Sequence, residues 1–438
     1  MTRLSFRIAV VFAAASCVLV PRLHAQQDTV RGVRIGLTYD PSIKPGLVVL
    51  PIAGALGDSV RAIIARDLDY SDRIIVTPLE ATPVASRQAN GSLNYALYAK
   101  LGAVGIVQAT ITPTGLRVVL HDVGKRAVAG SQDFMLPGPG LARDWRMGVH
   151  VASDEIENWV TGQRGIAQTR IAYVRAGVIR VIDSDGAFDT ALPPTGDVVS
   201  PSWNPTGTAL TYSTYGVNSR IYVLDLRTGK ARMLAATPYN TNITPVFTPD
   251  GSEIVYAHSG EGGTDLFSVS SNSGGQDARR LSVGHGWDNT NPSFNPDGRR
   301  IAFTSGRLGH PEIYVMDADG TNADLLTTFD FGDQNYRSDP DWSPDGRLIA
   351  FQSMIAGRFQ VLTISLRDRS TKLLTNDGIN EQPSWAPDAR HLVFTSTRSG
   401  TRQLWIVDAE SGRMRQLTHT APSRLAAWSP RLGAQVGP

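Results

Sequence analysis

The sequence predicts a mainly β protein: a six-bladed β-propeller preceded by a small α/β (α+β) domain. Three observations lead to this fold class. One motif recurs through the later part of the chain, its last copy is truncated, and the residues ahead of the repeats carry a different pattern of helices and strands. A chain of 438 residues is also longer than one ordinary hydrophobic core requires, which agrees with two domains.

The repeated motif joins an aromatic residue to a proline-containing turn. Its fullest copy, at 339–346, reads Asp-Pro-Asp-Trp-Ser-Pro-Asp-Gly. The aromatic positions of the six copies are Trp203, Phe247, Phe294, Trp342, Trp385 and Trp428, so successive copies lie 44, 47, 48, 43 and 43 residues apart. This period is typical of a four-stranded propeller blade.

Each repeat continues with turns and strands. Pro-Asp-Gly favours a tight turn, because proline fixes φ and glycine tolerates a positive φ. Alternating apolar and polar residues then predict strands at 300–305 and 312–317, and a closing strand around 325–327. Equivalent strands are expected at 221–226, 266–270, 360–365 and 404–408.

The truncated copy predicts how the ring closes. Trp428-Ser429-Pro430 stops where the other copies continue with a hairpin, and the missing strands are found at 170–174 and 178–183. One blade would therefore take its first strand from the C-terminus and its other three from 170 to about 192. The expected propeller spans 167–432, with a tail at 433–438, and pairing the two ends removes exposed sheet edges.

The α/β domain is expected at 41–166. A buried strand is predicted at 46–51, a helix beginning near Asp58, and a second helix at 92–101. Strands should follow at 105–112, 115–123 and 127–135, and a longer helix at 141–160 with Gly162 as its stop.

Residues 1–25 have the pattern of a cleavable signal peptide. Arg3 and Arg7 precede an apolar run of about a dozen residues, too short to span a membrane, and Ala25 supplies a small residue for cleavage. We therefore expect an exported protein, cleaved after Ala25. The only cysteine, Cys17, lies inside this segment; a lipoprotein site is the alternative, but Ala14 stands where a large aliphatic residue is usual.

Charge and composition exclude several classes of partner. The chain has 42 Lys and Arg against 40 Asp and Glu, a net charge of +2 with no basic run. Nucleic acid and anionic membrane surfaces are therefore not expected as main partners. We also expect no direct membrane insertion, and we expect a monomer.

No catalytic or cofactor motif emerges. There is no Gly-x-Ser-x-Gly elbow, and Gly57-Asp58-Ser59-Val60 is better explained by a helix start. The histidines at 258, 285, 310, 391 and 419 lack metal-ligand spacing, and the Asp-rich segments 183–186 and 317–320 are better explained as blade turns than as calcium loops. We therefore expect neither enzyme activity nor a cofactor or metal.

Taken together, these motifs resemble the TolB family. The repeats combine Pro-x-Trp-Ser-Pro-Asp-Gly with Ile-Ala-Phe and Ile-Tyr-Val-Met-Asp, and the segments 47–51, 150–156, 161–165 and 169–174 follow the family pattern in the same order. The resemblance covers essentially the whole chain after residue 25. It implies a periplasmic component of the Tol-Pal system, which supports outer-membrane integrity and constriction during cell division.

The resemblance also implies two protein partners. The inner-membrane protein TolA would bind the N-terminal segment 26–40, through Val33, Arg34, Ile35, Gly36, Leu37, Thr38, Tyr39 and Asp40, an alternating stretch able to add a strand to a sheet edge. Several residues, Gln26 to Gly32, precede this stretch and depart from the family pattern. The lipoprotein Pal would dock at the channel mouth, on Thr241, Asn242, Thr244, Asp288, Asn289, Thr290, Asn291, Arg337, Asp339, Asn380, Glu381 and Gln382.

Two other functions remain open at this point. Propellers can host enzymes, so a lyase or a peptidase-like enzyme acting on periplasmic glycan or peptide is one alternative. A scaffold that binds peptidoglycan directly is the other. For each mouth residue, the competing interpretation is a local turn or solvated side chain, because Asn and Thr often serve in turns.

Overall fold

The computed structural model describes residues 44–79, 92–216, 218–236, 240–282, 286–327 and 336–433, all within the compact unit Arg34–Pro438. The predicted signal peptide, the N-terminal segment 26–40 and the last five residues of the chain lie outside the described residues. The predictions made for them stay predictions.

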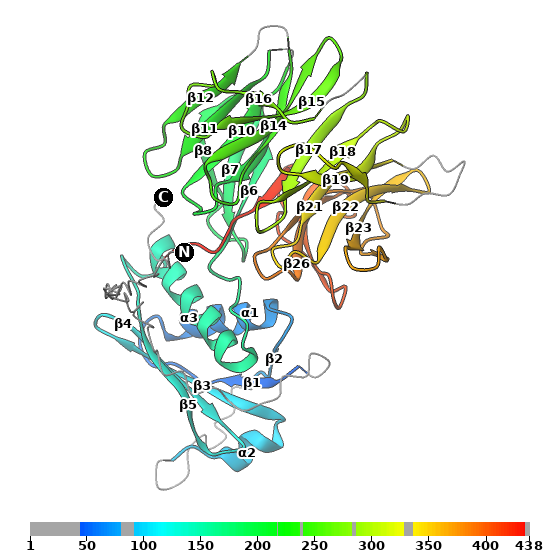
Figure 1. The fold of residues 1–438 in the computed structure, drawn as a ribbon. Helices are drawn as coiled ribbons and strands as arrows, with labels where there is room; N and C mark the ends of the chain where they lie inside the picture. The colour runs from blue at the N-terminus through cyan, green and yellow to red at the C-terminus, as the bar shows by residue number, and fades with distance from the viewer. Residues whose placement is uncertain are drawn as a thin grey trace, which may run out of the picture. The chain divides into compact units, whose positions relative to one another are not determined.

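The propeller consists of six four-stranded antiparallel sheets (Figure 1). The closing blade contains β29 (Arg424–Trp428), β6 (Arg170–Arg175), β7 (Val178–Asp183) and β8 (Thr190–Thr195). The next two blades are β9 (Val198–Trp203), β10 (Ala209–Thr214), β11 (Arg220–Asp225) and β12 (Ala231–Ala236), then β13 (Asn242–Phe247), β14 (Glu253–Gly260), β15 (Gly263–Ser270) and β16 (Arg279–Arg280). The last three are β17 (Asn289–Phe294), β18 (Arg300–Ser305), β19 (Glu312–Asp317) and β20 (Asp324–Leu325); β21 (Arg337–Trp342), β22 (Leu348–Ile355), β23 (Arg358–Ser365) and β24 (Thr371–Leu373); and β25 (Asn380–Trp385), β26 (His391–Ser396), β27 (Gln403–Asp408) and β28 (Met414–Gln416).

The ring closes as predicted. Strand β29 pairs with β6 in antiparallel register, placing Trp428 opposite Ile171 and Ala427 opposite Ala172. The indole nitrogen of Trp428 donates to Thr169 Oγ1 over 2.8 Å, and the Ser429 backbone N–H donates to the Arg170 carbonyl, also over 2.8 Å. The C-terminal strand thus completes the blade that the N-terminal end of the propeller begins.

The α/β domain is built on one five-stranded sheet in the order β2-β1-β3-β4-β5. Its elements are β1 (Gly46–Val49), α1 (Gly57–Tyr70), β2 (Ile75–Val76), α2 (Tyr95–Lys100), β3 (Ala103–Thr112), β4 (Gly115–Asp122), β5 (Ala127–Met135) and α3 (Arg143–Thr161). Helices α1 and α3 cover one face of the sheet (Figure 1). Gly162 ends α3 with φ of 73°, as its predicted role as a stop requires.

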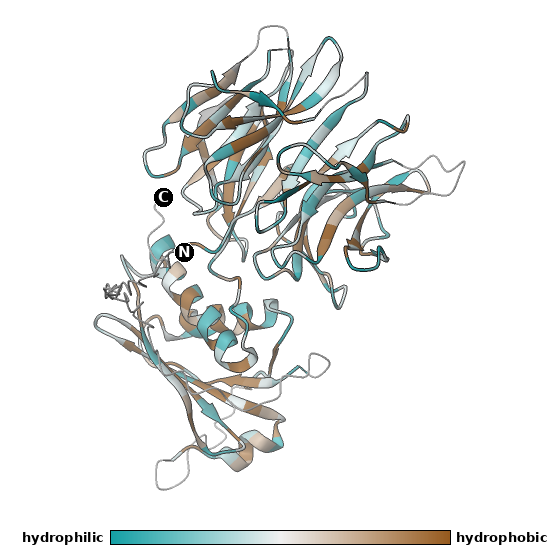
Figure 2. Cartoon of the chain, in the orientation of Figure 1, coloured by the Kyte–Doolittle hydropathy of each residue, from teal (hydrophilic) through white to brown (hydrophobic). Residues whose placement is uncertain are grey.

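Separate hydrophobic cores support the two regions. In the α/β domain, apolar residues of α1 and α3 such as Ile64, Val149 and Ile156 pack against the sheet. In the propeller, the clusters are formed by apolar residues of neighbouring blades. Figure 2 shows hydrophobic residues along the strands of these blades. Within the described part of the chain, no helix combines the length and hydropathy needed to span a bilayer.

Candidate functional site

The inner strands of the six blades surround a cavity of about 500 Å³ along the propeller axis. Five of these strands carry a proline in their middle, at Pro201, Pro245, Pro292, Pro340 and Pro383. A proline is tolerated there because the inner strand is the edge of its sheet, so no ladder hydrogen bond is lost on the channel side. The wall of the channel therefore combines prolines with short polar side chains.

Each inner strand bends where it faces the channel. Its pairing with the second strand of the blade shifts register, and the residue at the bend adopts a left-handed backbone. These residues, which we call the bulge ring, are Ser200, Thr244, Asn291, Asp339, Gln382 and Leu425, with φ between 51° and 57°. Such a conformation costs a non-glycine residue about 1–3 kcal/mol and is concentrated at functional sites.

Hydrogen bonds link the bulge ring from blade to blade. Asn291 Nδ2 donates to Asp339 Oδ1 over 2.6 Å, and the Asn291 N–H donates to Thr244 Oγ1 over 3.2 Å. On the other side, the Leu425 N–H donates to Gln382 Oε1 over 3.2 Å. Four residues predicted to contact Pal are thus brought together in one ring.

A second layer of contacts positions the recurring tryptophans. The Trp342 N–H donates to Ser293 Oγ over 2.9 Å, and the Trp385 N–H donates to Asp341 Oδ2 over 2.7 Å. The Trp385 indole nitrogen also donates to the Asp341 carbonyl over 3.1 Å. Trp342 and Trp385 therefore each join their blade to the preceding one.

Two carboxyl groups of β21 lie in the channel wall. Burial raises the pKa of Asp339 to about 6, against the opposing hydrogen bonds from Ser338 and Asn291. Burial likewise raises the pKa of Asp341 to about 6, although the Trp385 amide and Ser293 favour its charged form. The channel thus contains two carboxyls that exchange protons close to neutral pH.

Four of the predicted Pal-contact residues instead join neighbouring blades. Asn242, Asn289 and Asn380 have no solvent exposure. Their side-chain amides donate to the preceding blade: to the Ser219 carbonyl over 2.8 Å, to Asp265 Oδ1 over 3.1 Å, and to Gln360 Oε1 over 2.8 Å. Arg337 makes the equivalent contact, to Glu312 Oε2 over 2.9 Å. These four residues form what we call the inter-blade clamp.

The other predicted residues of the mouth are accessible. Asp288 is exposed, and Thr241, Thr290 and Glu381 are half-buried at the beginning of inner strands. The Thr241 N–H donates to Ser259 Oγ over 2.7 Å, and Arg402 donates to Glu381 Oε2 over 3.3 Å. With the bulge ring, these four side chains make up the polar surface at the start of the inner strands.

Apolar side chains at the same end of the blades were missed by the sequence reasoning. Trp287 lies two residues before β17 and is 38% exposed, and Tyr336 directly precedes β21 and is 43% exposed. Leu308, in the loop between β18 and β19, is 43% exposed. That loop begins beside the mouth, since the Gly306 N–H donates to the Asp288 carbonyl over 2.9 Å. An aromatic residue directly before an inner strand was the available signal.

Two buried histidines lie among carboxylates, where the sequence had indicated only scattered histidines. The two groups are Asp72, His391 and Asp408, and Asp67, His150 and Asp185, each compact enough to surround one ion. Arginines already occupy both groups, because Arg390 donates to Asp408 over 2.6 Å and Arg146 donates to Asp185. We therefore interpret them as ion-pair clusters.

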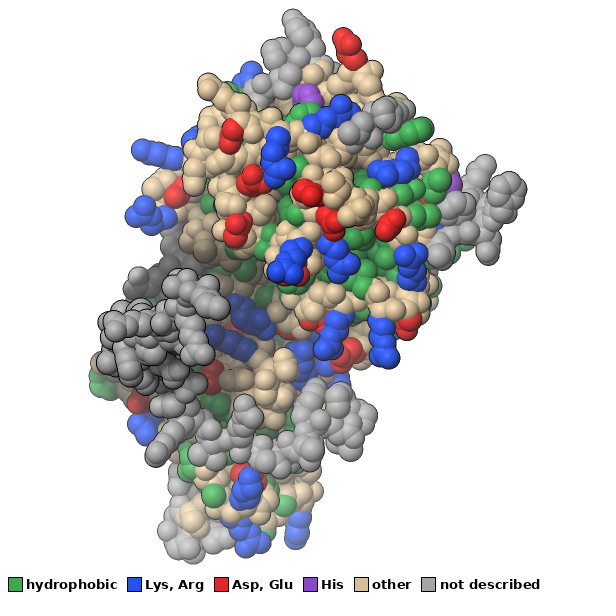
Figure 3. All heavy atoms as spheres, viewed as in Figure 1, with side chains coloured by type: hydrophobic (Ala, Val, Ile, Leu, Met, Phe, Trp, Pro, Cys, Tyr) green, Lys and Arg blue, Asp and Glu red, His purple; other side chains and the backbone are tan. Residues whose placement is uncertain are grey.

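The face drawn in Figure 3 shows charged side chains of both signs. Lys and Arg side chains alternate with Asp and Glu over the face drawn in Figure 3. This distribution agrees with the small net charge of +2 and gives no electrostatic footprint for nucleic acid on that face.

Comparison with known proteins adds three findings. A family model described as the TolB β-propeller domain matches residues 158–432. The Tol-Pal system protein TolB of Bordetella pertussis is 34% identical over 189 residues, covering 42% of this chain and 43% of that protein. The matching protein of Bordetella bronchiseptica is likewise 34% identical over 189 residues, with 42% of each chain covered. The alignment thus spans less than half the length of these curated relatives.

Among solved structures, TolB from Acinetobacter baumannii superimposes with a TM-score of 0.75 at 22% identity. The match covers 90% of this chain and 98% of that one, so it includes the α/β domain as well as the propeller. At 22% sequence identity, this superposition shows that the two proteins share a fold. Since the propeller family model covers more than half of the sequence, the chain belongs to the TolB family.

Proposed function

We propose that this protein is a periplasmic, non-catalytic component of the Tol-Pal system. It would bind Pal at the mouth of the propeller channel and TolA through the N-terminal segment 26–40, linking the inner-membrane TolA complex to the outer-membrane lipoprotein. In this way it would support outer-membrane integrity and constriction during division. The observation that carries the proposal is the bulge ring, a strained position repeated in all six blades and occupied by a polar residue in five of them.

The exposed part of the mouth has the chemistry of a protein-docking surface. Asp288 and Thr290 offer short hydrogen-bonding groups on a rigid strand, and Trp287 and Tyr336 beside them offer apolar area. Aromatic anchors surrounded by polar groups are typical of the residues that dominate binding energy. The clamp residue Asn289 would act indirectly, by fixing the strand that presents Thr290.

A binding role fits the channel better than catalysis does. Among the described residues that line it, the Ser293 and Ser384 hydroxyls accept hydrogen bonds from backbone N–H groups. The described lining contains no histidine, and the Asp341 carboxyl is held by the Trp385 amide and Ser293. A nucleophile paired with a base is therefore not assembled among these residues.

Binding of purified Pal by calorimetry tests the first partner. Thr290→Arg places a long charged side chain in the mouth and should weaken Pal binding about tenfold or more, and Asp288→Ala should weaken it less. Thr371→Arg is the matched control, because Thr371 is an exposed threonine on the outer strand β24. Unchanged Pal affinity in Thr290→Arg would remove the proposed site, and absence of Pal binding by the natural chain would remove the proposed function.

Deletion of residues 26–40 tests the second partner. The truncated protein should lose TolA binding while its propeller keeps its thermal unfolding transition and its capacity to bind Pal. Full TolA affinity after the deletion would place the TolA contact elsewhere.

A further inference from the structure

Helix α1 ends with charges of the wrong sign for a helix C-terminus. Asp67 and Asp69 lie in its last turn, Asp72 follows two residues after the helix ends, and the last turn contains no basic residue. The C-terminal end of a helix carries a partial negative charge, so acidic residues there are unfavourable unless cations approach from outside. This end of α1 therefore needs positive charge from another part of the chain.

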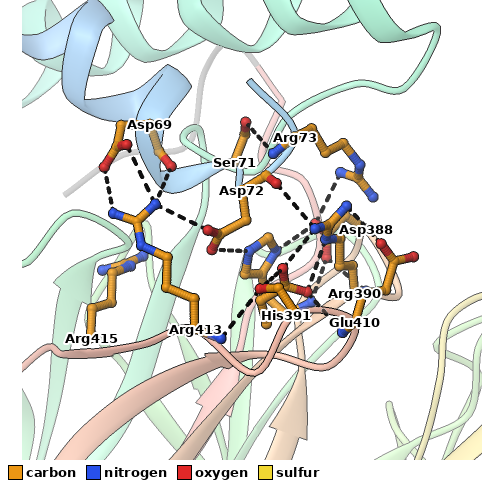
Figure 4. A network of polar contacts seen from close by, with 12 residues as sticks. Asp69, Ser71, Asp72, Arg73, Asp388, Arg390, His391, Glu410, Arg413 and Arg415 are labelled. Carbon is orange, nitrogen blue, oxygen red and sulfur yellow. Dashed lines mark hydrogen bonds and ion pairs between the residues drawn. The ribbon is translucent and has the colours of Figure 1, made fainter. Parts of the chain in front are cut away.

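The propeller supplies that charge (Figure 4). Arg413, just before β28, donates to Asp69 Oδ2 over 2.6 Å and to Asp72 Oδ1 over 3.0 Å. Arg415, on β28, places its guanidinium 4.2 Å from the centre of the Tyr70 ring. The contact that neutralises the end of α1 is thus one between the α/β domain and the propeller.

His391, the first residue of β26, lies at the centre of this contact. Its Nδ1 is 2.8 Å from Asp388 Oδ2 of its own blade, and its Nε2 is 3.2 Å from Asp72 Oδ2 of the α/β domain. The side chain is 1% exposed. Both ring nitrogens face carboxylate oxygens, which only accept hydrogen bonds, so both contacts are satisfied together only by the protonated imidazolium.

Other charged groups surround His391 from every neighbouring element. Arg390 pairs with Asp408 at the end of β27 and with Glu410, and it donates to the Asp72 carbonyl over 3.1 Å. The remaining partners belong to the α/β domain: Arg73 bonds Asp388 over 3.3 Å and Glu157 of α3 over 3.2 Å, and Lys44 lies 3.8 Å from Asp72. Acids and bases alternate across the contact, and each carboxylate has at least one cation beside it.

A second histidine repeats the arrangement. His150, on α3 and fully buried, has its Nδ1 2.7 Å from Asp67 Oδ2 and its Nε2 3.5 Å from Asp185 Oδ2. Asp185 belongs to the propeller turn after β7 and also receives Arg66 and Arg146. Here too a ring stands between a carboxylate of the α/β domain and one of the propeller.

Apolar packing contributes little to this junction. The buried hydrophobic clusters of the described chain are formed either by residues 47–160 or by residues 166–428, and none joins the two sets. Burying ion pairs stabilises an interface less than burying apolar side chains, because the charges lose their hydration. The stability of such an interface also depends on which of its side chains are charged.

We infer that His391 is a protonated latch that holds the α/β domain against the propeller, and that the domain is released when this histidine loses its proton. A neutral ring has one N–H group and can donate to only one of the two carboxylates, so the other loses its hydrogen bond from His391 in a buried site. The latch depends on the charges of Asp72 and Asp388, which lie in different domains.

The electrostatics set the pH range of the latch. Burial alone lowers the pKa of His391, but Asp388, Asp72 and Asp408 outweigh it and raise the pKa to about 9, from an ordinary value of 6.5. A raised pKa in the docked state means that the stabilisation is complete below pH 6.5 and is lost as the pH rises through about 9. In that interval the equilibrium constant for domain opening should rise about tenfold per pH unit.

Single-molecule energy transfer on the intact protein without its signal peptide tests the inference. Since Cys17 is the only cysteine of the sequence, Lys100→Cys on α2 and Thr371→Cys on β24 give one labelling site in each domain. The doubly labelled protein should be closed at pH 6 to 8 and should acquire an open population towards pH 10, while tryptophan fluorescence shows that the propeller stays folded.

His391→Gln is the decisive variant, because glutamine keeps hydrogen-bonding capacity without the charge. Its open fraction should be raised at pH 7 and should increase less between pH 6 and 10 than that of the natural chain, because only His150 still titrates at the junction, whereas His419→Gln, at an exposed histidine, should follow the natural profile. The same pH profile in His391→Gln and the natural chain would overturn the inference. If His391→Gln does not fold, histidine NMR of the natural chain decides: a ring that titrates near 6.5 overturns the latch, and one that titrates well above 8 supports it.

Discussion

The side-chain amide of Asn289 donates a hydrogen bond to Asp265 Oδ1 of the preceding blade over 3.1 Å, in a site without solvent exposure. The neighbouring Thr290 belongs to the accessible mouth. These adjacent residues thus have different roles, because successive side chains of a strand point to opposite faces of the sheet. One fixes the blade to its neighbour, and the other is left for a partner.

Asn289→Ala should therefore destabilise the propeller. It removes the donor to Asp265 in a buried site and leaves Ser305, which donates to Asn289 Oδ1 over 2.7 Å, without its acceptor. We expect a loss of about 1–3 kcal/mol in the free energy of unfolding, measured by urea denaturation. Asn272→Ala, at an exposed turn asparagine, should change it by less than about 0.5 kcal/mol. Equal stability of the two variants would show that the clamp contributes nothing.

Ring closure by the C-terminal strand predicts a large cost for Trp428→Ala. The side chain is 6% exposed, packs in the cluster of Ile171 and Tyr173, and bonds Thr169. Its loss should lower the free energy of unfolding by about 3–5 kcal/mol, as for other large core residues. Trp287→Ala removes the same side chain from an exposed position and should have little effect on the unfolding midpoint. A mild effect of Trp428→Ala would contradict the importance of closure.

The channel carboxyl of Asp341 predicts a pH dependence. Because burial raises its pKa in the folded state from 3.8 to about 6, its contribution to stability is complete below pH 3.8 and is lost as the pH rises through 6. The stability of Asp341→Asn relative to the natural chain should therefore increase between pH 4 and pH 7. Thermal unfolding of both proteins across that range measures the difference. A difference that stays constant with pH would mean that the carboxyl titrates normally.

Salt provides an independent test of the contact between the domains. Arg413→Gln removes the cation that Asp69 and Asp72 share. At low salt the variant should exchange its amide hydrogens as the natural protein does in 1 M salt. In both cases exchange should be faster than in the natural protein at low salt at the end of α1, but not in β18 or β22. Arg347→Gln, at an exposed arginine on the propeller, is the control. Unchanged exchange at the end of α1 in Arg413→Gln would argue against electrostatic docking.

The blades could be predicted from sequence because their determinants are local. The motif at 339–346 contains the channel strand and the turn that follows it, and the predicted strands at 300–305 and 312–317 coincide with β18 and β19. The closing blade was also predictable, since the truncated copy at Trp428 lacks strands that residues 170–183 supply.

The chemistry of single residues was less accessible. Asn289 was predicted as a partner contact because its place before a repeat aromatic is visible in the sequence, whereas its acceptor Asp265 lies 24 residues away in another blade. His391 appeared isolated because its partner Asp72 is 319 residues away in the α/β domain. Both roles depend on tertiary contacts that leave no local pattern.

The measurement that tests the proposed docking surface most directly is amide hydrogen exchange of the protein with and without Pal. We predict added protection in 286–291 and at the beginning of β21 and β25, with the outer strands β12 and β24 unchanged. Protection confined to the outer strands or to the α/β domain, with the mouth unaffected, would contradict it.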